Sequence, residues 1–367
     1  MDKGLDIEGL RSLLACHAAL GAEPLGCGAL RTARNLPRHP AAAAATLRES
    51  AAHAGLAPCW DAADRAFAWA ANDASRHLVP YGDARYPDPL YEIATPPVLL
   101  FVDGRVEVLA RPQLAIVGSR KATASARAFA AAIAVAACEI GLVVTSGMAW
   151  GIDAAAHVAA LEGSGETIAV FGCGIDRVYP ASHRKLAERI RAQGALVSEF
   201  PLGEAPRKPN FPQRNRLIAG LSLGTLVVEA ALRSGSLSTA RHALEQGREV
   251  FAVPGNVGNP LSRGCHDLLR QGAKLTESIA DIIEEIPALQ TMGRGAPDTT
   301  PAGSGDDPAL EPRARRLLEA WGWDAVSIDE LADRAGLTVQ DVSSILLALE
   351  LAGHVETRAS GTYARVR

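Results

Sequence analysis

Between residues 113 and 254, short apolar runs alternate with longer amphipathic stretches, and this alternation strongly constrains the fold. Runs that are apolar along their whole length are typical of strands buried on both faces of a sheet. Helical stretches between them favour parallel pairing, and the pattern predicts an α/β fold with a Rossmann-like, doubly wound, mostly parallel sheet. We expect strands at 114–118, 142–146, 167–172, 195–200, 225–230 and 249–254, and helices at 125–139, 152–162, 182–193, 215–221 and 236–246.

The chain is long enough for two or three domains. Residues 1–80 are rich in alanine, with periodic apolar positions interrupted by prolines, which predicts a domain of short helices. An extended core follows at 81–287, and it opens with a turn-rich connection at 80–97. Residues 288–311 have the Gly, Pro, Thr and Ser content that is typical of a flexible linker.

Residues 312–367 have the order of elements of a winged-helix domain. After a first helix, Ser327 is a good N-cap for a second helix that ends at Gly336. Thr338 is expected to cap a third helix, and alternation over 353–366 predicts a two-stranded wing. A small helical tail with a frayed end is the alternative interpretation.

Composition excludes several classes of protein. A net charge of −4 excludes a chain that is basic all over, but it allows a local basic groove because salt screens surface charges beyond about 10 Å. The chain shows no apolar membrane span and no signal pattern, so we expect a cytoplasmic protein. The six cysteines are scattered without a C-x-x-C motif, which argues against a disulfide framework or zinc site. We expect them to act as small buried apolar residues, and we expect no metal or cofactor.

Small residues follow most of the expected strands. Glycine lets a backbone approach a ligand closely, and serine hydroxyls and helix N-termini offer donors to an anion. Parallel strands end at one edge of the sheet, so these loops would together form a phosphate cradle, although each alone also fits an ordinary tight turn. The loops are Gly118-Ser119-Arg120, Ser146-Gly147, Gly172-Cys173-Gly174 and Ser234-Gly235-Ser236.

The run at 207–216 is the most basic segment near these loops. It holds four cations and one aromatic ring, and no acid. Cations beside a ring that can stack are typical of single-stranded nucleic-acid binding. A solvated loop whose Phe211 packs into the core is the simpler interpretation, and the surrounding loops favour binding.

The chain has no convincing catalytic site. It lacks the glycine motifs of dinucleotide and triphosphate binding, and no nucleophile stands near a base in an obvious pair. Asp153 and His157 lie four residues apart on one expected helix. A helix-capping carboxylate and a half-buried histidine explain this pair more simply than catalysis does.

Five long motifs, in order, resemble the DNA-processing protein A (DprA, also called Smf) family over roughly residues 80–286. The tail from about residue 312 resembles the winged-helix domain of some members, and residues 1–80 resemble the family's SAM-like helical domain loosely, with a degraded glycine-hairpin pattern at 21–28. The motifs are Ala115-Ile-Val-Gly-Ser-Arg120, Thr145-Ser-Gly-Met-Ala-Trp-Gly-Ile-Asp153, Arg214-Asn-Arg-Leu-Ile-Ala-Gly-Leu-Ser222, Ser234-Gly-Ser-Leu-Ser-Thr-Ala240 and Val250-Phe-Ala-Val-Pro-Gly255.

The resemblance implies a non-enzymatic homodimer that binds single-stranded DNA, protects incoming DNA and loads the RecA recombinase during natural transformation. Carried over by motif, Gly118, Ser119 and Arg120 would hold backbone phosphate, with Ser146 and Gly147 nearby. The residues of the basic run and the later serine loop would complete the DNA-binding surface. Lys208 would add charge, Phe211 would stack on a base, Arg214 and Arg216 would extend a basic wall, Asn215 would offer a hydrogen bond, and Ser234, Gly235 and Ser236 would line the cradle.

Two other functions compete with this interpretation. A Rossmann-like nucleotide-phosphate hydrolase would use the same loops and would need a carboxylate near them, for which Glu229 is the candidate. A transcription regulator would read duplex DNA with its winged helix. The expected recognition helix at 338–352 contains acids and no Arg or Lys, which favours a protein-contact or accessory role.

Overall fold

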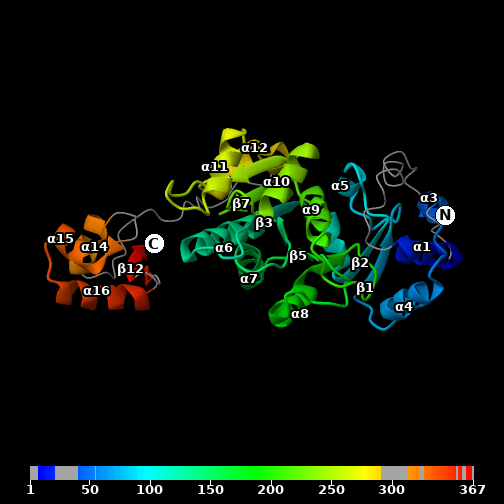
Figure 1. Cartoon of the computed structure of the whole chain (residues 1–367), viewed down its shortest axis with the longest axis horizontal. Coiled ribbons are helices and arrows are strands. Elements are labelled where there is room, and N and C mark those ends of the chain that lie inside the picture. The colour runs from blue at the N-terminus through cyan, green and yellow to red at the C-terminus, as the bar shows by residue number, and fades with distance from the viewer. Residues whose placement is uncertain are drawn as a thin grey trace.

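The computed structural model describes residues 7–20, 40–53, 55–290, 312–321, 326–352, 354–357 and 361–365. These residues form an N-terminal group of helices, a central nine-stranded sheet with helices on its faces, and a small C-terminal domain (Figure 1). The predicted α/β class with a mostly parallel sheet is confirmed.

Three helices precede the sheet, and α1 packs against both α3 and α4. Their apolar positions, such as Leu13, Leu47 and Ala63, are buried as the periodicity predicts. The degraded glycine pattern at 21–28 lies outside the described residues. The helices are α1 (Ile7–Leu20), α3 (Pro40–His53) and α4 (Trp60–Ala71).

The nine strands stand in the order β1-β2-β6-β5-β4-β3-β7-β8-β9, and all neighbours from β6 to β9 are parallel. The chain runs outward from the central β3 through β4, β5 and β6, then returns to the other side of β3 at β7. Ligands bind at such a switch point, beyond the carboxyl ends of the strands. The strands are β1 (Arg76–Pro80), β2 (Leu99–Gly104), β3 (Gln113–Gly118), β4 (Val143–Ser146), β5 (Thr167–Val170), β6 (Ala195–Ser198), β7 (Gly224–Val228), β8 (Glu249–Ala252) and β9 (Lys274–Leu275).

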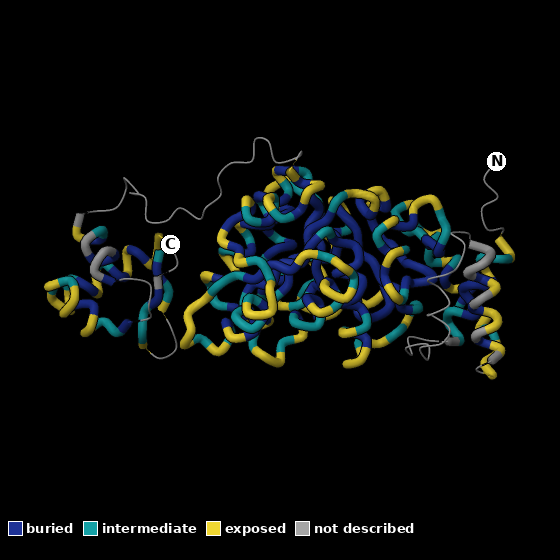
Figure 2. The backbone as a smooth tube through the Cα atoms, turned by 90° about the horizontal axis from the view of Figure 1, so that it is seen from above, coloured by how far each residue is buried: buried dark blue, intermediate teal, exposed yellow. Residues whose placement is uncertain are grey.

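Alternate residues of β3 pack on opposite faces of the sheet. Leu114 and Ile116 join a core with α6, α7 and α12, whereas Ala115 and Val117 join a core with α9 and α10. Figure 2 shows the resulting buried interior. The helical segments are α5 (Asp88–Tyr91), η1 (Val106–Ala110), α6 (Ala124–Glu139), α7 (Ile152–Glu162), η2 (Ala181–His183), α8 (Arg184–Gln193), α9 (Asn210–Leu221), α10 (Ser236–Glu245), α11 (Arg263–Arg270), α12 (Ile279–Glu285) and α13 (Pro287–Gln290).

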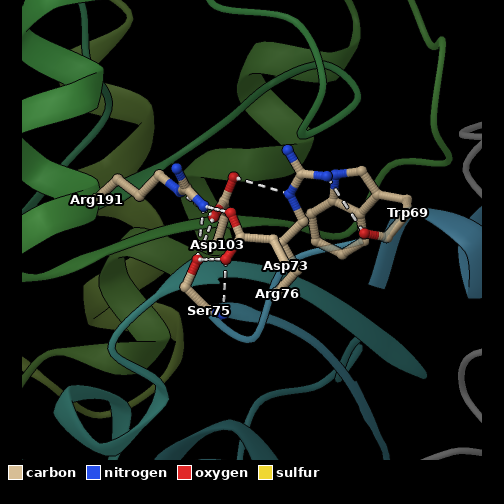
Figure 3. Close-up of polar contacts among 6 residues, drawn as sticks. All are labelled: Trp69, Asp73, Ser75, Arg76, Asp103 and Arg191. Atoms are coloured by element: carbon tan, nitrogen blue, oxygen red, sulfur yellow. Dashed lines mark hydrogen bonds and ion pairs between the residues drawn. The ribbon is translucent and has the colours of Figure 1, made fainter. Parts of the chain in front are cut away.

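The antiparallel strands β1 and β2 extend the sheet at its β6 edge. Arg191 of α8 fastens this extension, since its guanidinium binds the carboxylates of Asp103 on β2 and Asp73 in the turn after α4 (Figure 3). Hydrogen bonds from Ser75 and Arg191 lower the pKa of Asp73 to about 2. Because β1 belongs to the sheet, the sheet begins at Arg76, before residue 81, where we expected the core to start.

All six expected strands form, but several end two residues early. The residues after β5 and β6, such as Phe171 and Phe200, are buried loop residues whose apolar character extended the predicted strands. Helix α9 begins at Asn210, not at Asn215 as predicted. Pro212 lies in the first turn of α9, where the backbone nitrogen has no helical hydrogen bond to lose. The helix can therefore begin before this proline and not only after it.

The C-terminal residues form the predicted winged-helix arrangement, with a third short strand that was not predicted. Ser327 Oγ accepts a hydrogen bond from the Glu330 amide, Thr338 Oγ1 accepts one from the Asp341 amide, and Gly336 ends its helix with φ 63°. The elements are α14 (Pro312–Trp321), β10 (Val326–Ser327), α15 (Ile328–Ala335), α16 (Val339–Leu351), β11 (Val355–Thr357) and β12 (Thr362–Arg365).

Two expectations from composition can be compared with the described residues. Within them, no helix is both long and apolar enough to cross a membrane. Cys16, Cys173 and Cys265 are buried as predicted, Cys138 is half-buried, and Cys27 lies outside the described residues. Cys59 is exposed, so the expectation is wrong for this residue. Cys59 precedes α4 at the surface, where its position does not require an apolar side chain.

Candidate nucleic-acid interface

The loops after β3 and β7 lie side by side at the switch point of the sheet. Gly118 and Val228 are register partners, and the Ser119 amide donates a hydrogen bond to the Glu229 carbonyl at 2.7 Å. A Cβ at Gly118 would lie 2.0 Å from the Val228 carbonyl oxygen. Glycine at 118 is therefore required by the close packing of β3 against β7.

Arg120 and Phe211 are brought together from distant parts of the sequence. The exposed guanidinium of Arg120 lies over the Phe211 ring, with its Cζ 5.8 Å from the ring centroid. This is a favourable cation–π distance. A Cβ at Gly172 would lie 2.9 Å from the ring, so the absence of a side chain at 172 makes room for Phe211 beside the β5 loop. Phe211 is half-buried, which leaves part of it open to solvent.

Tyr179 belongs to the same cluster and was missed from the sequence. Its ring is 43% exposed and lies 5.6 Å from the Phe211 ring, centroid to centroid. A single aromatic residue in a polar loop does not by itself indicate a binding site. The position of Tyr179 in the loop after the Gly172–Gly174 turn could have indicated its role, since loops at the carboxyl ends of parallel strands surround the ligand site.

Lys208 and Arg207 are exposed just before α9. Arg207 lies beside Glu204, with 3.3 Å between Nε and Oε1, whereas Lys208 forms no ion pair among the described residues. Lys208 is thus an exposed cation three residues before Phe211 in the sequence. Lys121, which follows Arg120, is a further exposed cation that was not predicted.

Arg214 and Arg216 do not form the exposed basic wall that we expected. They are 5% and 8% exposed, because α9 begins early and turns both side chains into the protein. Arg214 donates hydrogen bonds from Nη1 to the carbonyls of Gly147 and Val170, at the ends of β4 and β5. Burial lowers its pKa to about 10, so the guanidinium stays charged at neutral pH.

The neighbours of Arg214 on α9 also contact protein. Arg216 pairs with the buried carboxylate of Glu199, whose pKa is raised by burial even though the arginine opposes this shift. Asn215 donates from Nδ2 to the Gly235 carbonyl at 3.2 Å and accepts a hydrogen bond from Arg214 Nε. The three side chains thus connect α9 to the loops after β4, β5, β6 and β7.

Ser146 and Gly147 are buried behind the surface. The Ser146 hydroxyl donates to the Ile116 carbonyl at 2.6 Å, so it is not free for a ligand. A Cβ at Gly147 would lie 2.6 Å from Arg214 Nη2. The Gly147 amide donates to the Asp153 carboxylate at 3.1 Å. This loop fixes the position of its neighbours.

The serine loop after β7 is tightly folded at the start of α10. Ser234 Oγ lies 2.6 Å from Ser236 Oγ and accepts a hydrogen bond from the Ser236 amide. Gly235 between them is exposed, whereas Ser236 is buried. The loop lies against α9 through Asn215, and it presents Gly235 to solvent.

The titratable groups near the edge have structural partners. Burial raises the pKa of Asp153, and its carboxylate accepts hydrogen bonds from the Gly147 and Ala149 amides. It therefore stabilises the loop before α7, which corrects our expectation of a simple helix cap. His157 is fully buried rather than half-buried, with Nδ1 2.7 Å from Thr167 Oγ1. Burial lowers its pKa to about 3.

Glu229 is also held by neighbouring residues. Its carboxylate accepts hydrogen bonds from the amide and hydroxyl of Thr123, at 2.9 and 3.0 Å, and from Asn259 Nδ2 at 3.2 Å. These bonds connect the loops after β3, β7 and β8. Among the described residues, no group of three or more His, Cys, Asp or Glu side chains is placed to hold a metal.

Two family descriptions match the chain. Residues 77–287 match the DNA recombination-mediator protein A family, and residues 300–361 match the DprA winged helix domain. Protein Smf of Escherichia coli is 45% identical over 297 residues, which cover 80% of this chain and 78% of that protein. The DNA processing protein DprA of Streptococcus pneumoniae is 47% identical over 203 residues, covering 55% of this chain and 72% of that protein.

Two solved structures share the fold. The X-ray structure of DprA from Streptococcus pneumoniae aligns with a TM-score of 0.60 and 36% identity, covering 77% of this chain and 97% of that one. A Helicobacter pylori DNA processing protein A, described with a single-stranded DNA binding mode, aligns at 0.51 and 30%, covering 55% and 93%. On sequence and fold together, this chain belongs to the DNA recombination-mediator protein A (DprA/Smf) family.

Proposed function

We propose that this protein binds single-stranded DNA at the carboxyl edge of its parallel sheet and acts as a recombination mediator, not as an enzyme. The observation that carries the proposal is the exposed Arg120 guanidinium over the half-buried Phe211 ring, with the free cation Lys208 three residues away in sequence. The described binding mode of the Helicobacter pylori relative supports the same ligand.

The arrangement suits a single strand for a physical reason. A base can stack on Phe211 only when its face is free, and a duplex hides base faces between neighbours. In the unbound protein Arg120 covers the ring. When a base arrives, Arg120 moves to the adjoining phosphate, where a guanidinium forms strong charge-assisted hydrogen bonds. Stacking is indifferent to base identity, so we expect little sequence preference.

The predicted site residues divide into two groups in this proposal. Arg120, Lys208 and Phe211 contact DNA, and Gly118, Ser119 and the Ser234–Ser236 loop shape the phosphate cradle beside them. The second group holds the loops in position and does not contact DNA, because its side chains are buried and bind protein groups, and its one glycine is buried with its amide bound to Asp153. It consists of Ser146, Gly147, Arg214, Asn215 and Arg216.

The cellular role that we propose follows from family membership. The protein would act in the cytoplasm as a homodimer, protect incoming single strands and load the RecA recombinase onto them during natural transformation. The family's description as a recombination mediator supports this role. A loading assay with purified RecA on single strands precoated with a competing single-strand-binding protein tests it directly.

The binding site is tested by fluorescence anisotropy with a labelled oligothymidylate. We expect Arg120→Ala, Lys208→Ala and Phe211→Ala each to weaken binding, the last by roughly 1–3 kcal/mol. Arg270→Ala is the matched control, since Arg270 is an exposed cation at the C-terminal end of α11 and is not one of the proposed site residues. Unchanged affinity in both Arg120→Ala and Phe211→Ala would refute this placement of the site.

The nucleotide-phosphate hydrolase remains the competing function, and the contacts of Glu229 argue against it. A catalytic carboxylate must reach the substrate, but this one already accepts three hydrogen bonds from Thr123 and Asn259. We expect no release of free base when the protein is incubated with nucleoside monophosphates. Release that disappears in Glu229→Gln would establish the hydrolase instead.

A further inference from the structure

A second set of exposed rings lies next to the proposed site. Trp150, in the loop after β4, is 50% exposed, and Tyr179, in the loop after β5, is 43% exposed. Both loops are at the carboxyl edge of the sheet, like Arg120. Large exposed aromatics are costly to leave in water and commonly mark a binding surface. The position of Trp150 is not explained by packing in the core.

Trp150 is held in a fixed position by the neighbouring loop. Its indole Nε1 donates a hydrogen bond to Ser182 Oγ at 3.2 Å, and its ring lies edge-on to His183 with 6.4 Å between centroids. His183 Nδ1 in turn lies 2.9 Å from the Met148 carbonyl oxygen. The polar atom of the indole is thus satisfied by protein while half of the side chain stays open. A ring fixed in this way loses little entropy when a ligand stacks on it.

The rings continue into a basic surface on α8. Arg184, Lys185 and Arg189 of α8 are exposed, as is Arg177 in the loop before it. The exposed carboxylates among them are Asp176 in that loop and Glu188 on α8. None of these four cations forms an ion pair within the part of the chain that the structure describes. Arg191 differs from them, because it is bound by Asp73 and Asp103 (Figure 3).

Cations at the start of α8 are unfavourable for the helix itself, since the positive end of the helix dipole repels them. Arg184 and Lys185 occupy its first two positions, where acidic residues would be stabilising. The first turn of α8 therefore carries positive charge that does not serve helix stability. An anionic ligand would compensate both the side chains and the helix end.

We propose that a single strand bound at Arg120 and Phe211 continues across Tyr179, His183 and Trp150 onto the first turn of α8. We call the second part, formed by Trp150, Tyr179, His183, Arg184 and Lys185, the α8 track. Tyr179 contacts Phe211, which makes the two parts continuous. Tyr179 and His183 are four residues apart, a span of at most about 14 Å, which roughly four stacked nucleotides cover. The inference rests on the proposed function and extends its binding site.

The α8 track predicts that affinity depends on strand length. Anisotropy would compare oligothymidylates of about 4 and about 16 nucleotides, the range of site sizes in compact single-strand-binding folds. The variants are Trp150→Ala and the double variant Arg184→Ala/Lys185→Ala. We expect each to weaken binding of the long strand about five-fold or more and to leave the short strand unchanged.

Two controls separate stacking and charge from other effects. Trp150→Phe keeps a ring but loses the hydrogen bond to Ser182, so it should bind the long strand nearly as the wild type does. Arg241→Ala/Arg270→Ala removes two exposed cations from α10 and α11 and should leave binding of both lengths unchanged. Circular dichroism and thermal unfolding would check that each variant is folded.

The outcomes distinguish the α8 track from the proposed function. If Arg120→Ala weakens both lengths while the track variants bind both normally, the α8 track is refuted and the primary site stands. If the track variants weaken both lengths equally, the length-dependent path is likewise refuted. If the wild type binds neither length, the proposed function fails, and the α8 track fails with it.

Discussion

Arg214 illustrates how a cation in a basic segment can stabilise the protein instead of binding its ligand. It was expected on the surface from the composition of 207–216, yet its guanidinium donates to the Gly147 and Val170 carbonyls. The ends of β4 and β5 are thereby held at fixed positions next to α9. Hydrogen bonds from a buried charge to carbonyls are strong, and their loss leaves polar groups unsatisfied.

The buried contacts of Arg214 predict that its removal costs stability. We expect Arg214→Ala to lower the free energy of unfolding by about 3 kcal/mol, because two carbonyls lose their donor and Asp153 loses a nearby positive charge. Urea unfolding would measure the change. Lys208→Ala, which removes an exposed cation of the same segment, should leave stability unchanged. A stable Arg214→Ala protein with impaired DNA binding would mean that Arg214 acts at the DNA.

His157 makes folding sensitive to acid. Burial lowers its pKa to about 3 in the folded state, against about 6.5 when unfolded, so the unfolded chain binds the proton first. Stability from this group is therefore complete above pH 6.5 and falls as pH drops toward 3. The loss is about 1.4 kcal/mol per pH unit below 6.5. Chemical denaturation at several pH values should show a shallower decline for His157→Leu; parallel curves would contradict this account.

At the level of residues, the sequence predicted which loops lie at the sheet edge better than it predicted which side chains reach solvent. Arg120, Lys208 and Phe211 lie at the surface as expected, since each is in or beside a loop at the sheet edge. Arg214 and Arg216 have the same chemistry but lie deeper in α9. Composition shows how many charges a segment holds but not where its side chains point. Separating buried Arg214 and Arg216 from exposed Lys208 required knowing where α9 begins and how it is oriented.

Among the elements, the six parallel strands between residues 113 and 254 were predicted, whereas the strands outside them, β1, β2 and β9, were missed. The central strands are apolar throughout because helices cover both faces of the sheet, and such continuous apolar runs can be recognised in the sequence. Strands β1 and β9 gave no such signal: β1 begins with Arg76 and His77, and β9 has two residues. Their pairing with β2 and β8 depends on contacts distant in sequence.

The turn between α15 and α16 depends on a left-handed residue. Gly336 has φ 63° and has no atom within 4 Å of a would-be Cβ, so the backbone conformation alone disfavours a side chain. Gly336→Ala should destabilise the winged-helix domain by about 1 kcal/mol, whereas Gly336→Asn should cost less. Hydrogen exchange of the α15 and α16 amides in the full chain would show this. Equal exchange in Gly336→Ala and the wild type would contradict it.

In the whole molecule, the sheet brings together side chains that lie between residues 120 and 211 of the sequence. Arg120 follows β3, Tyr179 follows β5 and Phe211 belongs to α9, yet the three side chains form one cluster. The chain's overall charge of −4 gives no sign of this, because a total over the whole sequence does not show which cations lie together. A strand bound there would depend on local charge and would be sensitive to salt.

The central claim is single-strand binding at this edge, and a salt series with matched single and double strands tests it most directly. For a short single strand of about 4 nucleotides, which does not reach the α8 track, three phosphate contacts from Arg120, the adjoining Lys121 and Lys208 predict a slope of about −2 in log affinity against log salt. The account predicts much weaker duplex binding and a flatter slope for Arg120→Ala. Equal affinity for duplex, or single-strand binding that is indifferent to salt, would contradict it.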